Sequence, residues 1–267
     1  MLRLSGGMKT LLITGGSSGI GLATVQLFVE KGWQVFELSR SGKSSEGVHH
    51  ISCDVTDESS VQLAIEEVMK HTSVIDVVVS NAGFGISGAI EFTSSPEAHR
   101  QFDVNFFGAF YLVKHVLPIL RDQNKGRILF TSSVAADLSI PYQSFYSASK
   151  SALNAFALAL ANEVRDFGVK VSVLMPGDVA TGFTDAREKR IEGTAVYKHV
   201  ESAVAAMERD ERGGMSPLQM ACILYHMAIC RFLKPIYIGG NIYKVYYLLN
   251  RLFPKQFVNW IVGKLYS

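Results

Sequence analysis

The chain of 267 residues has few cysteines and no long apolar run. Its three cysteines form no CxxC pair, which argues against a zinc site and a disulfide framework and favours a reducing compartment, the cytoplasm. The seven histidines show no metal-ligand spacing either, so we expect no metal. The sequence has no uninterrupted stretch of about 20 apolar residues, so we expect no membrane-spanning helix. Met1–Gly7 lacks the apolar stretch of a secretory signal.

Acidic residues are absent after Glu211. All 24 Asp and Glu residues lie at or before that position, whereas seven of the 26 basic residues follow it: Arg212, Arg231, Lys234, Lys244, Arg251, Lys255 and Lys264. Aromatic residues are interleaved with the last four of these cations. A basic, aromatic-rich tail favours a membrane surface or an apolar substrate over nucleic acid, whose binding sites need denser positive charge.

Short apolar stretches typical of buried strands alternate with segments of helical periodicity. The expected strands are Thr10–Thr14, Gln34–Leu38, Val48–Cys53, Val74–Ser80, Arg127–Ser132 and Lys170–Met175. The expected helices between them are Ile20–Lys31, Ser59–His71, Glu97–Leu120 and Tyr146–Phe167. Strands joined by helical crossovers predict a doubly wound, parallel α/β sheet of the Rossmann type in a single domain.

Beyond the sixth strand the pattern changes. We expect residues 8–181 to form the nucleotide-binding and catalytic core, and residues 216–267 a C-terminal substrate region. The charged residues 182–215 lie where ligands bind in such sheets, so we expect a mobile substrate lid, with a solvated surface helix as the alternative. The C-terminal region should contain an apolar helix with Cys222, His226 and Cys230 buried, a strand, and an amphipathic helical extension: Ser216–Cys230, Pro235–Ile238 and Asn241–Leu265, broken at Pro254.

A glycine-rich turn, Thr14–Gly21 with the sequence TGGSSGIG, follows the first strand and opens the first helix. Glycines let a backbone approach a pyrophosphate closely, and the helix N-terminus offers free N–H groups at a positive dipole end. Many strand–helix turns contain glycines, however, and the TGxxxGxG spacing differs from the GxGxxG dinucleotide fingerprint. The turn by itself therefore only suggests a nucleotide site.

Further motifs follow in a fixed order. Asn81-Ala82-Gly83 comes after the fourth strand, Ser133 ends the fifth, the sequence YSASK occupies Tyr146–Lys150, and Pro176-Gly177 with Thr181 comes after the sixth strand. With the glycine-rich turn, these motifs resemble the short-chain dehydrogenase/reductase family over Thr14–Thr181. The resemblance weakens after Phe183. It implies an oxidoreductase on a Rossmann fold.

The resemblance implies a catalytic set of Ser133, Tyr146, Lys150 and Asn105. Tyr146 and Lys150 are one helical turn apart, so their polar ends share a face. We expect the ammonium, together with a cationic oxidised nicotinamide, to lower the phenol's pKa from its usual value near 10. Ser133 should hydrogen-bond the substrate oxygen. The resemblance gives Asn105 a water-holding role in proton relay; the alternative is a polar residue on a dimer-facing helix.

Cofactor choice depends on the end of the second strand. A carboxylate there would accept a hydrogen bond from a ribose 2′-hydroxyl, whereas an arginine would pair with a 2′-phosphate. Arg40 therefore favours NADP(H) over NAD(H), although Ser17-Ser18 stands where the resemblance leads us to expect a second basic residue. The expected cofactor-binding residues are Gly15, Ser17, Ser18, Gly19, Ile20, Gly21, Ser39, Arg40, Ser41, Asp54, Val55, Asn81, Ala82, Gly83, Tyr146, Lys150, Pro176, Gly177, Val179 and Thr181. Asp54 and Val55 resemble the family's adenine contacts.

These observations predict an NADP(H)-dependent oxidoreductase that interconverts a secondary alcohol and a ketone (or aldehyde) by hydride transfer. The tail is similar to those of family members that act on steroids, retinoids and other lipid alcohols, which favours a bulky lipophilic substrate such as a hydroxysteroid. The alternatives are a 3-oxoacyl-thioester reductase and a catalytically idle NADP(H)-binding scaffold; the Ser133, Tyr146 and Lys150 set argues against the scaffold.

The expected partners are a small lipophilic substrate and a second copy of the chain, with no nucleic acid. The helices expected over Glu97–Leu120 and Tyr146–Phe167 carry apolar residues on more than one face, which favours a homodimer or a higher oligomer. The tail is expected either to close the substrate cleft or to make a peripheral membrane contact.

Overall fold

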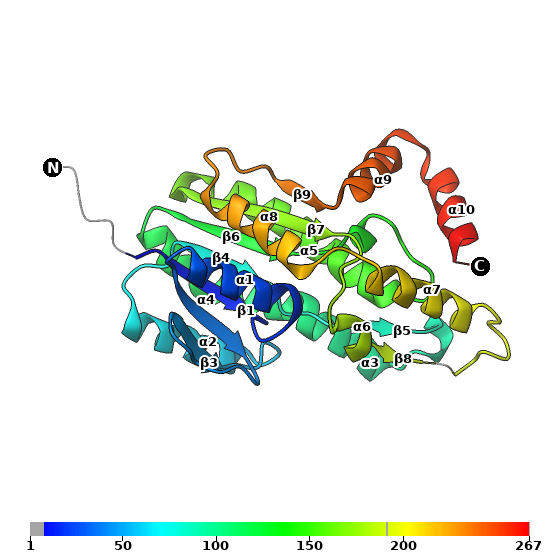
Figure 1. Cartoon of the computed structure of the whole chain (residues 1–267), viewed down its shortest axis with the longest axis horizontal. Helices are drawn as coiled ribbons and strands as arrows, with labels where there is room; N and C mark the ends of the chain where they lie inside the picture. Colours follow the sequence, from blue (N-terminus) through cyan, green and yellow to red (C-terminus); the bar gives the residue numbers. More distant parts are fainter. Residues whose placement is uncertain (1–7, 191, 267) are drawn as a thin grey trace.

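The fold is centred on a seven-stranded parallel sheet with the order β3-β2-β1-β4-β6-β7-β9 (Figure 1). The computed structural model describes residues 8–190 and 192–266, so the expectation for Met1–Gly7 lies outside it. The strands are β1 (Thr10–Thr14), β2 (Gln34–Ser39), β3 (Val48–Ser52), β4 (Val77–Ser80), β6 (Gly126–Thr131), β7 (Val169–Pro176) and β9 (Ile236–Gly239). The predicted doubly wound α/β sheet is confirmed.

Helices cover both faces of this sheet, as parallel strands buried on both sides require. Two helices, α1 (Gly19–Glu30) and α8 (Pro217–Ile229), pack side by side on one face. The other face is covered by α2 (Glu58–His71), α4 (Gly108–Asp122) and α5 (Ser144–Glu163). A buried apolar cluster lies under each layer, and the strands supply both clusters with alternate side chains.

The long helix expected over Glu97–Leu120 is interrupted. The structure has α3 (Ser95–Phe102), a π-helical segment (Asp103–Phe107) and then α4. A π segment inserts one residue into a turn and leaves the apolar periodicity on either side nearly unchanged, which is why the sequence predicted one helix. The helix expected over Tyr146–Phe167 ends earlier, at Glu163, and continues into a 3₁₀ turn at Arg165–Phe167.

Residues 182–190 and 192–215 fold against the edge of the sheet where the strands end (Figure 1). They contain α6 (Phe183–Ala186), β8 (Glu188–Lys189) and α7 (Val200–Arg212). Strand β8 pairs with β5 (Ile86–Ser87), and 3₁₀ turns lie at Ile90–Phe92 and Val134–Ala136. One face of α7 is buried, so this helix packs against the protein and differs from the solvated surface helix given as the alternative.

The C-terminal extension forms two helices, α9 (Asn241–Leu252) and α10 (Lys255–Leu265), which stand out from the layered body (Figure 1). The break lies at Pro254, as predicted. Within the described residues no helix is long and apolar enough to cross a bilayer. The expectation that Cys222 and His226 are buried is wrong, because α8 turns its Met220, Leu224 and Met227 side to the core and leaves these two exposed.

Candidate active site

Two cavities lie side by side at the carboxyl ends of the strands. One, of about 230 Å³, is lined by Ser133, Tyr146 and Lys150. The other, of about 490 Å³, is lined by Arg40 and Asp54. Both are lined by Gly15, Ala82 and Gly83, so the end of β1 and the turn after β4 form their common floor.

The glycine-rich turn makes that floor by backbone geometry. Gly15 has φ +67°, and a Cβ there would lie 2.8 Å from the Cα of Ala82. Gly19, with φ +52°, begins α1. A Cβ on Gly21 would lie 2.0 Å from the carbonyl oxygen of Gly15, so Gly21 supports the turn from behind and lines neither cavity. Ser18 caps α1 without a side-chain hydrogen bond, and Ser18, Gly19 and Ile20 line the smaller cavity, so this helix N-terminus fits the pyrophosphate of a dinucleotide.

The smaller cavity brings together residues from two elements. Ser133 follows β6, and its Oγ accepts a hydrogen bond from the backbone N–H of Ala135 at 3.1 Å. Tyr146 and Lys150 lie one turn apart on α5. The Lys150 Nζ donates to the carbonyl oxygen of Thr131 at 3.0 Å and lies 5.9 Å from the centroid of the Tyr146 ring.

Burial dominates the ionisation of both groups. It raises the pKa of Tyr146 to about 12, and a hydrogen bond with Ser133 acts in the opposite direction. It lowers the pKa of Lys150 to about 8. The Lys150 ammonium is directed to Thr131, and burial outweighs it at the phenol. At neutral pH the phenol therefore keeps its proton and is a proton donor. The expected lowering of the phenol pKa, which also involves the nicotinamide cation, stays a prediction.

Asn105 does not reach either cavity. It lies in the π-helical segment, is 1% exposed, and has every hydrogen bond of its amide inside the protein. Its Oδ1 accepts from the Phe84 N–H at 3.0 Å, and its Nδ2 donates to the Phe84 carbonyl and to Ser149 Oγ, each at 3.1 Å. The side chain thus positions the loop after β4 and the N-terminal part of α5. It lies on no exposed helix face, contrary to the alternative.

The larger cavity contains the residues expected at the adenosine end. Arg40 is exposed at its rim, between Ser39 and Ser41. The Asp54 carboxylate accepts hydrogen bonds from the backbone and hydroxyl of Thr56 at 3.0 and 2.8 Å, which lower its pKa. These contacts fix the carboxylate at the wall.

Most of the expected cofactor and catalytic residues line one cavity or the other. Those at the smaller cavity are Gly15, Ser18, Gly19, Ile20, Asn81, Ala82, Gly83, Ser133, Tyr146, Lys150, Pro176, Gly177, Val179 and Thr181. Those at the larger one are Gly15, Ser17, Ser39, Arg40, Ser41, Asp54, Val55, Ala82 and Gly83. Gly21 and Asn105 lie outside both.

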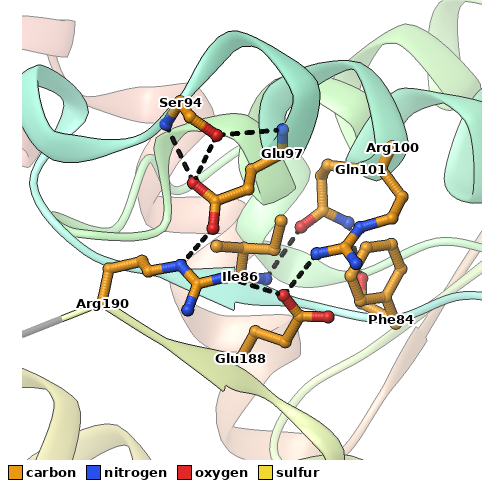
Figure 2. A network of polar contacts seen from close by, with 8 residues as sticks. All are labelled: Phe84, Ile86, Ser94, Glu97, Arg100, Gln101, Glu188 and Arg190. Atoms are coloured by element: carbon orange, nitrogen blue, oxygen red, sulfur yellow. Dashed lines mark hydrogen bonds and ion pairs between the residues drawn. The ribbon is translucent and has the colours of Figure 1, made fainter.

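The segment expected to be a lid is held against α3 and β5 by ion pairs and hydrogen bonds, next to the larger cavity. Figure 2 shows how Arg100 of α3 and Arg190 both pair with the carboxylate of Glu188, while Arg190 also pairs with Glu97. Gln101 of α3 binds the backbone around β5 through both ends of its amide. Because Glu188 and Arg100 line the larger cavity, this network forms part of its wall.

Other wall residues went unnoticed in the sequence. The smaller cavity is also lined by Gln143, Asp178, Phe183, Ala186, Met207, Glu211 and Tyr266, and the larger one by Phe84 and Arg100. Asp178 had a signal, since it directly follows Pro176-Gly177. The others come from segments without a motif. Tyr266, which directly follows α10, brings one residue of the tail to the cavity.

The comparisons with known proteins agree with this geometry. The family model described as short chain dehydrogenase matches residues 9–192. A 3-ketodihydrosphingosine reductase from Bacteroides thetaiotaomicron is 38% identical over 227 residues, covering 84% of this chain and 82% of that protein. A short-chain dehydrogenase crystal structure from Streptomyces avermitilis is 29% identical, with a TM-score of 0.81 and 93% coverage of both chains.

A short chain dehydrogenase/reductase from Burkholderia phymatum, solved in complex with NAD, shares the fold. Its TM-score is 0.78 at 23% identity, and 94% of each chain is covered. The Rossmann sheet, the glycine-rich turn and the extent of the family match lead to one conclusion: the chain is an oxidoreductase of the short-chain dehydrogenase/reductase family.

Proposed function

We propose that this protein is an NADP(H)-dependent oxidoreductase that reduces the ketone of a long-chain lipid to a secondary alcohol. The observation that carries the proposal is the position of the Tyr146 phenol beside Ser133, in a cavity that Tyr266 of the C-terminal tail also lines. The relative that is 38% identical is named for a long-chain 2-amino ketone, which favours such a substrate over the hydroxysteroid predicted from the tail.

Each catalytic side chain then has a defined task. Tyr146 donates its proton to the carbonyl oxygen, which the Ser133 hydroxyl holds in place. Lys150, fixed by the Thr131 carbonyl, provides a positive charge near the phenol as the proton leaves. The nicotinamide, when bound, supplies the hydride. Asn105 acts at a distance, by fixing the loop after β4.

The choice of NADP(H) rests on the hydrogen bonds that the carboxylate of Glu37, in β2, makes within the protein. Glu37 is 3% exposed, and its Oε1 accepts from the Gly16 N–H at 2.9 Å. Its Oε2 contacts Ser39 Oγ at 3.1 Å and His50 Nδ1 at 2.7 Å. With both oxygens engaged, Glu37 is not available to a ribose 2′-hydroxyl. The exposed guanidinium of Arg40 is the group that meets the 2′ position, and it suits a phosphate.

The outer face of the tail suits a lipid surface. It carries exposed apolar side chains over both helices: Ile242, Val245, Leu248, Leu249, Leu252, Phe257, Trp260 and Leu265. Leu252 is 68% and Trp260 60% exposed. Cations accompany them and no acid does. Such helices lie in the interface of anionic bilayers. We therefore place a peripheral contact with an anionic membrane here, on the cytoplasmic side, where the free cysteines stay reduced.

The two sheet-covering helices α4 and α5 support a homodimer. Phe107, just before α4, is 40% exposed and Leu158 of α5 is 38% exposed, and the small residues Ala155 and Ala159 are exposed beside Leu158. Small side chains permit close helix approach across a two-fold axis. Light scattering at micromolar concentration should give twice the mass of one chain, and a monomer would contradict this part of the proposal.

A substrate screen tests the function directly. NADPH oxidation is followed with 3-ketodihydrosphingosine, a ketosteroid, retinal and a 3-oxoacyl thioester of similar size. We expect the first to have the highest kcat/KM. A higher kcat/KM for the ketosteroid or the thioester would instead support a hydroxysteroid dehydrogenase or a 3-oxoacyl-thioester reductase. Tight NADPH binding without turnover of any compound would identify the idle scaffold.

A further inference from the structure

Two carboxylates line the smaller cavity, those of Asp178 and Glu211, and they differ in the hydrogen-bond partners that they have. Glu211 is compensated, because it pairs with the buried guanidinium of Arg187 and accepts a hydrogen bond from Thr184 Oγ1 at 2.7 Å. Asp178, in contrast, accepts its hydrogen bond from the neutral hydroxyl of Tyr243, which lies on α9. Arg187 favours the ionised form of Asp178 only weakly, since it is already paired.

The position of Asp178 is fixed on two sides. It directly follows Pro176-Gly177 at the end of β7, and its carbonyl accepts a hydrogen bond from the Met215 N–H at 2.9 Å. The ring of Tyr243 packs so closely over Gly177 that a Cβ there would lie 2.1 Å from it. The carboxylate is therefore held at the cavity wall by both the sheet and the tail, with little freedom to turn outward.

Asp178 lines the same cavity as Tyr146. Burial raises the pKa of Asp178, and the charges of Glu211 and Asp210 add to the effect. In turn, the negative charges of Glu211 and Asp178 raise the pKa of the Tyr146 phenol. A carboxylate that is buried without a counter-ion is costly, and a cation placed beside it recovers much of that cost.

We propose that Asp178 binds the ammonium group of an amino-ketone substrate, on the carbon adjacent to the carbonyl that Tyr146 protonates. This inference rests on the proposed reduction of a long-chain ketone and adds the residue that selects among such ketones. The substrate nitrogen then sits between the carboxylate and the phenol. Both its charge and its N–H donors match a carboxylate that, among the described residues, accepts one hydrogen bond, from the neutral hydroxyl of Tyr243.

Selection works in two directions. An amino ketone gains a charge-assisted hydrogen bond, whereas a ketone without the amino group leaves Asp178 desolvated and unpaired. The bound ammonium also offsets the negative charge that disfavours proton release from Tyr146. The charged groups that act on Asp178 and on the phenol are Asp210, Glu211 and Arg187, and the hydroxyls of Tyr243 and Tyr266 lie in the same field. The Lys150 ammonium lines the same cavity and is directed to Thr131.

The test uses the full chain, NADPH and two ketones of equal chain length, 3-ketodihydrosphingosine and its analogue without the amino group. The wild type should prefer the amino ketone by at least about tenfold in kcat/KM. In Asp178→Asn, kcat/KM for the amino ketone should fall by about tenfold to a hundredfold, mostly through KM. For the analogue it should change by less than about threefold or rise.

Tyr243→Phe is the matched control, because it removes the tie to α9 and keeps the carboxylate. It should retain the preference for the amino ketone. If Asp178 only anchors the tail, both variants lose activity on both ketones equally, and the proposal is overturned. Calorimetry adds a readout without turnover: the saturated amino alcohol product should bind the wild type and Tyr243→Phe at least about tenfold more tightly than Asp178→Asn.

The possible failures separate cleanly. A wild type that reduces neither ketone would contradict the proposed function. If the wild type reduces the analogue with the same kcat/KM as the amino ketone, the proposed oxidoreductase activity is supported, but the proposed ammonium site is overturned. Thermal unfolding and NADPH titration confirm that Asp178→Asn is folded; if it is not, Asp178→Ser replaces it, and the wild-type preference still decides.

Discussion

The two ends of the cleft differ in what makes them. At the proposed nucleotide end, which begins at the glycine-rich turn, the backbone gives the site its shape, because Gly15 and Gly19 take positive φ angles. At the substrate end the wall consists of side chains brought from distant segments, among them Asp178, Met207 and Tyr266. The first kind of site appears in the sequence as a compact motif, whereas the second has no local pattern.

The strongest test of this division is Tyr146→Phe. We expect turnover to fall by at least about 10²–10⁴-fold, because the proton donor is lost, while NADPH affinity stays within about threefold. Tyr197→Phe, whose hydroxyl binds Glu91 outside both cavities, is the control and should keep its activity. Steady-state kinetics and fluorescence titration measure the two effects. More than about a tenth of wild-type activity in Tyr146→Phe would contradict the assigned role.

Arg40→Asp attacks the nucleotide end instead. It removes the partner of the 2′-phosphate and places a like charge there, so NADPH affinity should fall by about tenfold to a hundredfold while NADH affinity holds or improves. Lys43→Asp makes the same charge change on the following turn, at an exposed residue that lines neither cavity, and should have little effect. A wild type that already prefers NADH would show that Glu37 does not decide the cofactor as we argue.

The pH profile tests whether burial controls the substrate end. Lys150 has a pKa of about 8, so its charge is present below that pH and lost as the pH rises through it. The phenol, with a pKa near 12, stays protonated well beyond this range. The kcat/KM for ketone reduction should therefore be flat up to about pH 8 and then decline, by up to about tenfold per pH unit. Lys150→Arg should move the decline to higher pH; an unmoved profile would assign it to another group.

The smallest effect is expected at the outer face of the tail. Leu252→Glu combined with Trp260→Glu should reduce co-flotation with anionic liposomes several-fold, with NADPH binding unchanged. Leu63→Glu on α2, an equally exposed leucine, is the control. High salt should weaken wild-type flotation, because it screens the tail's cations. If the double variant co-floats like the wild type but is monomeric by light scattering, the outer face of the tail contacts a second copy of the chain and not a membrane.

Several features were predictable because their cause is local. The strands β1, β6 and β7 were found within a residue or two, since buried parallel strands are continuous apolar runs. The break at Pro254 has an equally local cause. The π-helical segment around Asn105 was missed; the hydrogen bonds that its Asn105 side chain makes join it to the chain after β4 and to α5, which are distant in the sequence.

The sequence alone determined the sheet, the glycine-rich turn, the helix that carries Tyr146 and Lys150, and the unbalanced charge of the tail. Each follows from residues that are neighbours in the chain or one helical turn apart. Tertiary structure alone decided the direction of the Lys150 ammonium, the engagement of Glu37, and the meeting of Asp178, Glu211 and Tyr266 beside the phenol. These depend on burial and on contacts between distant segments, and neither is a property of local sequence.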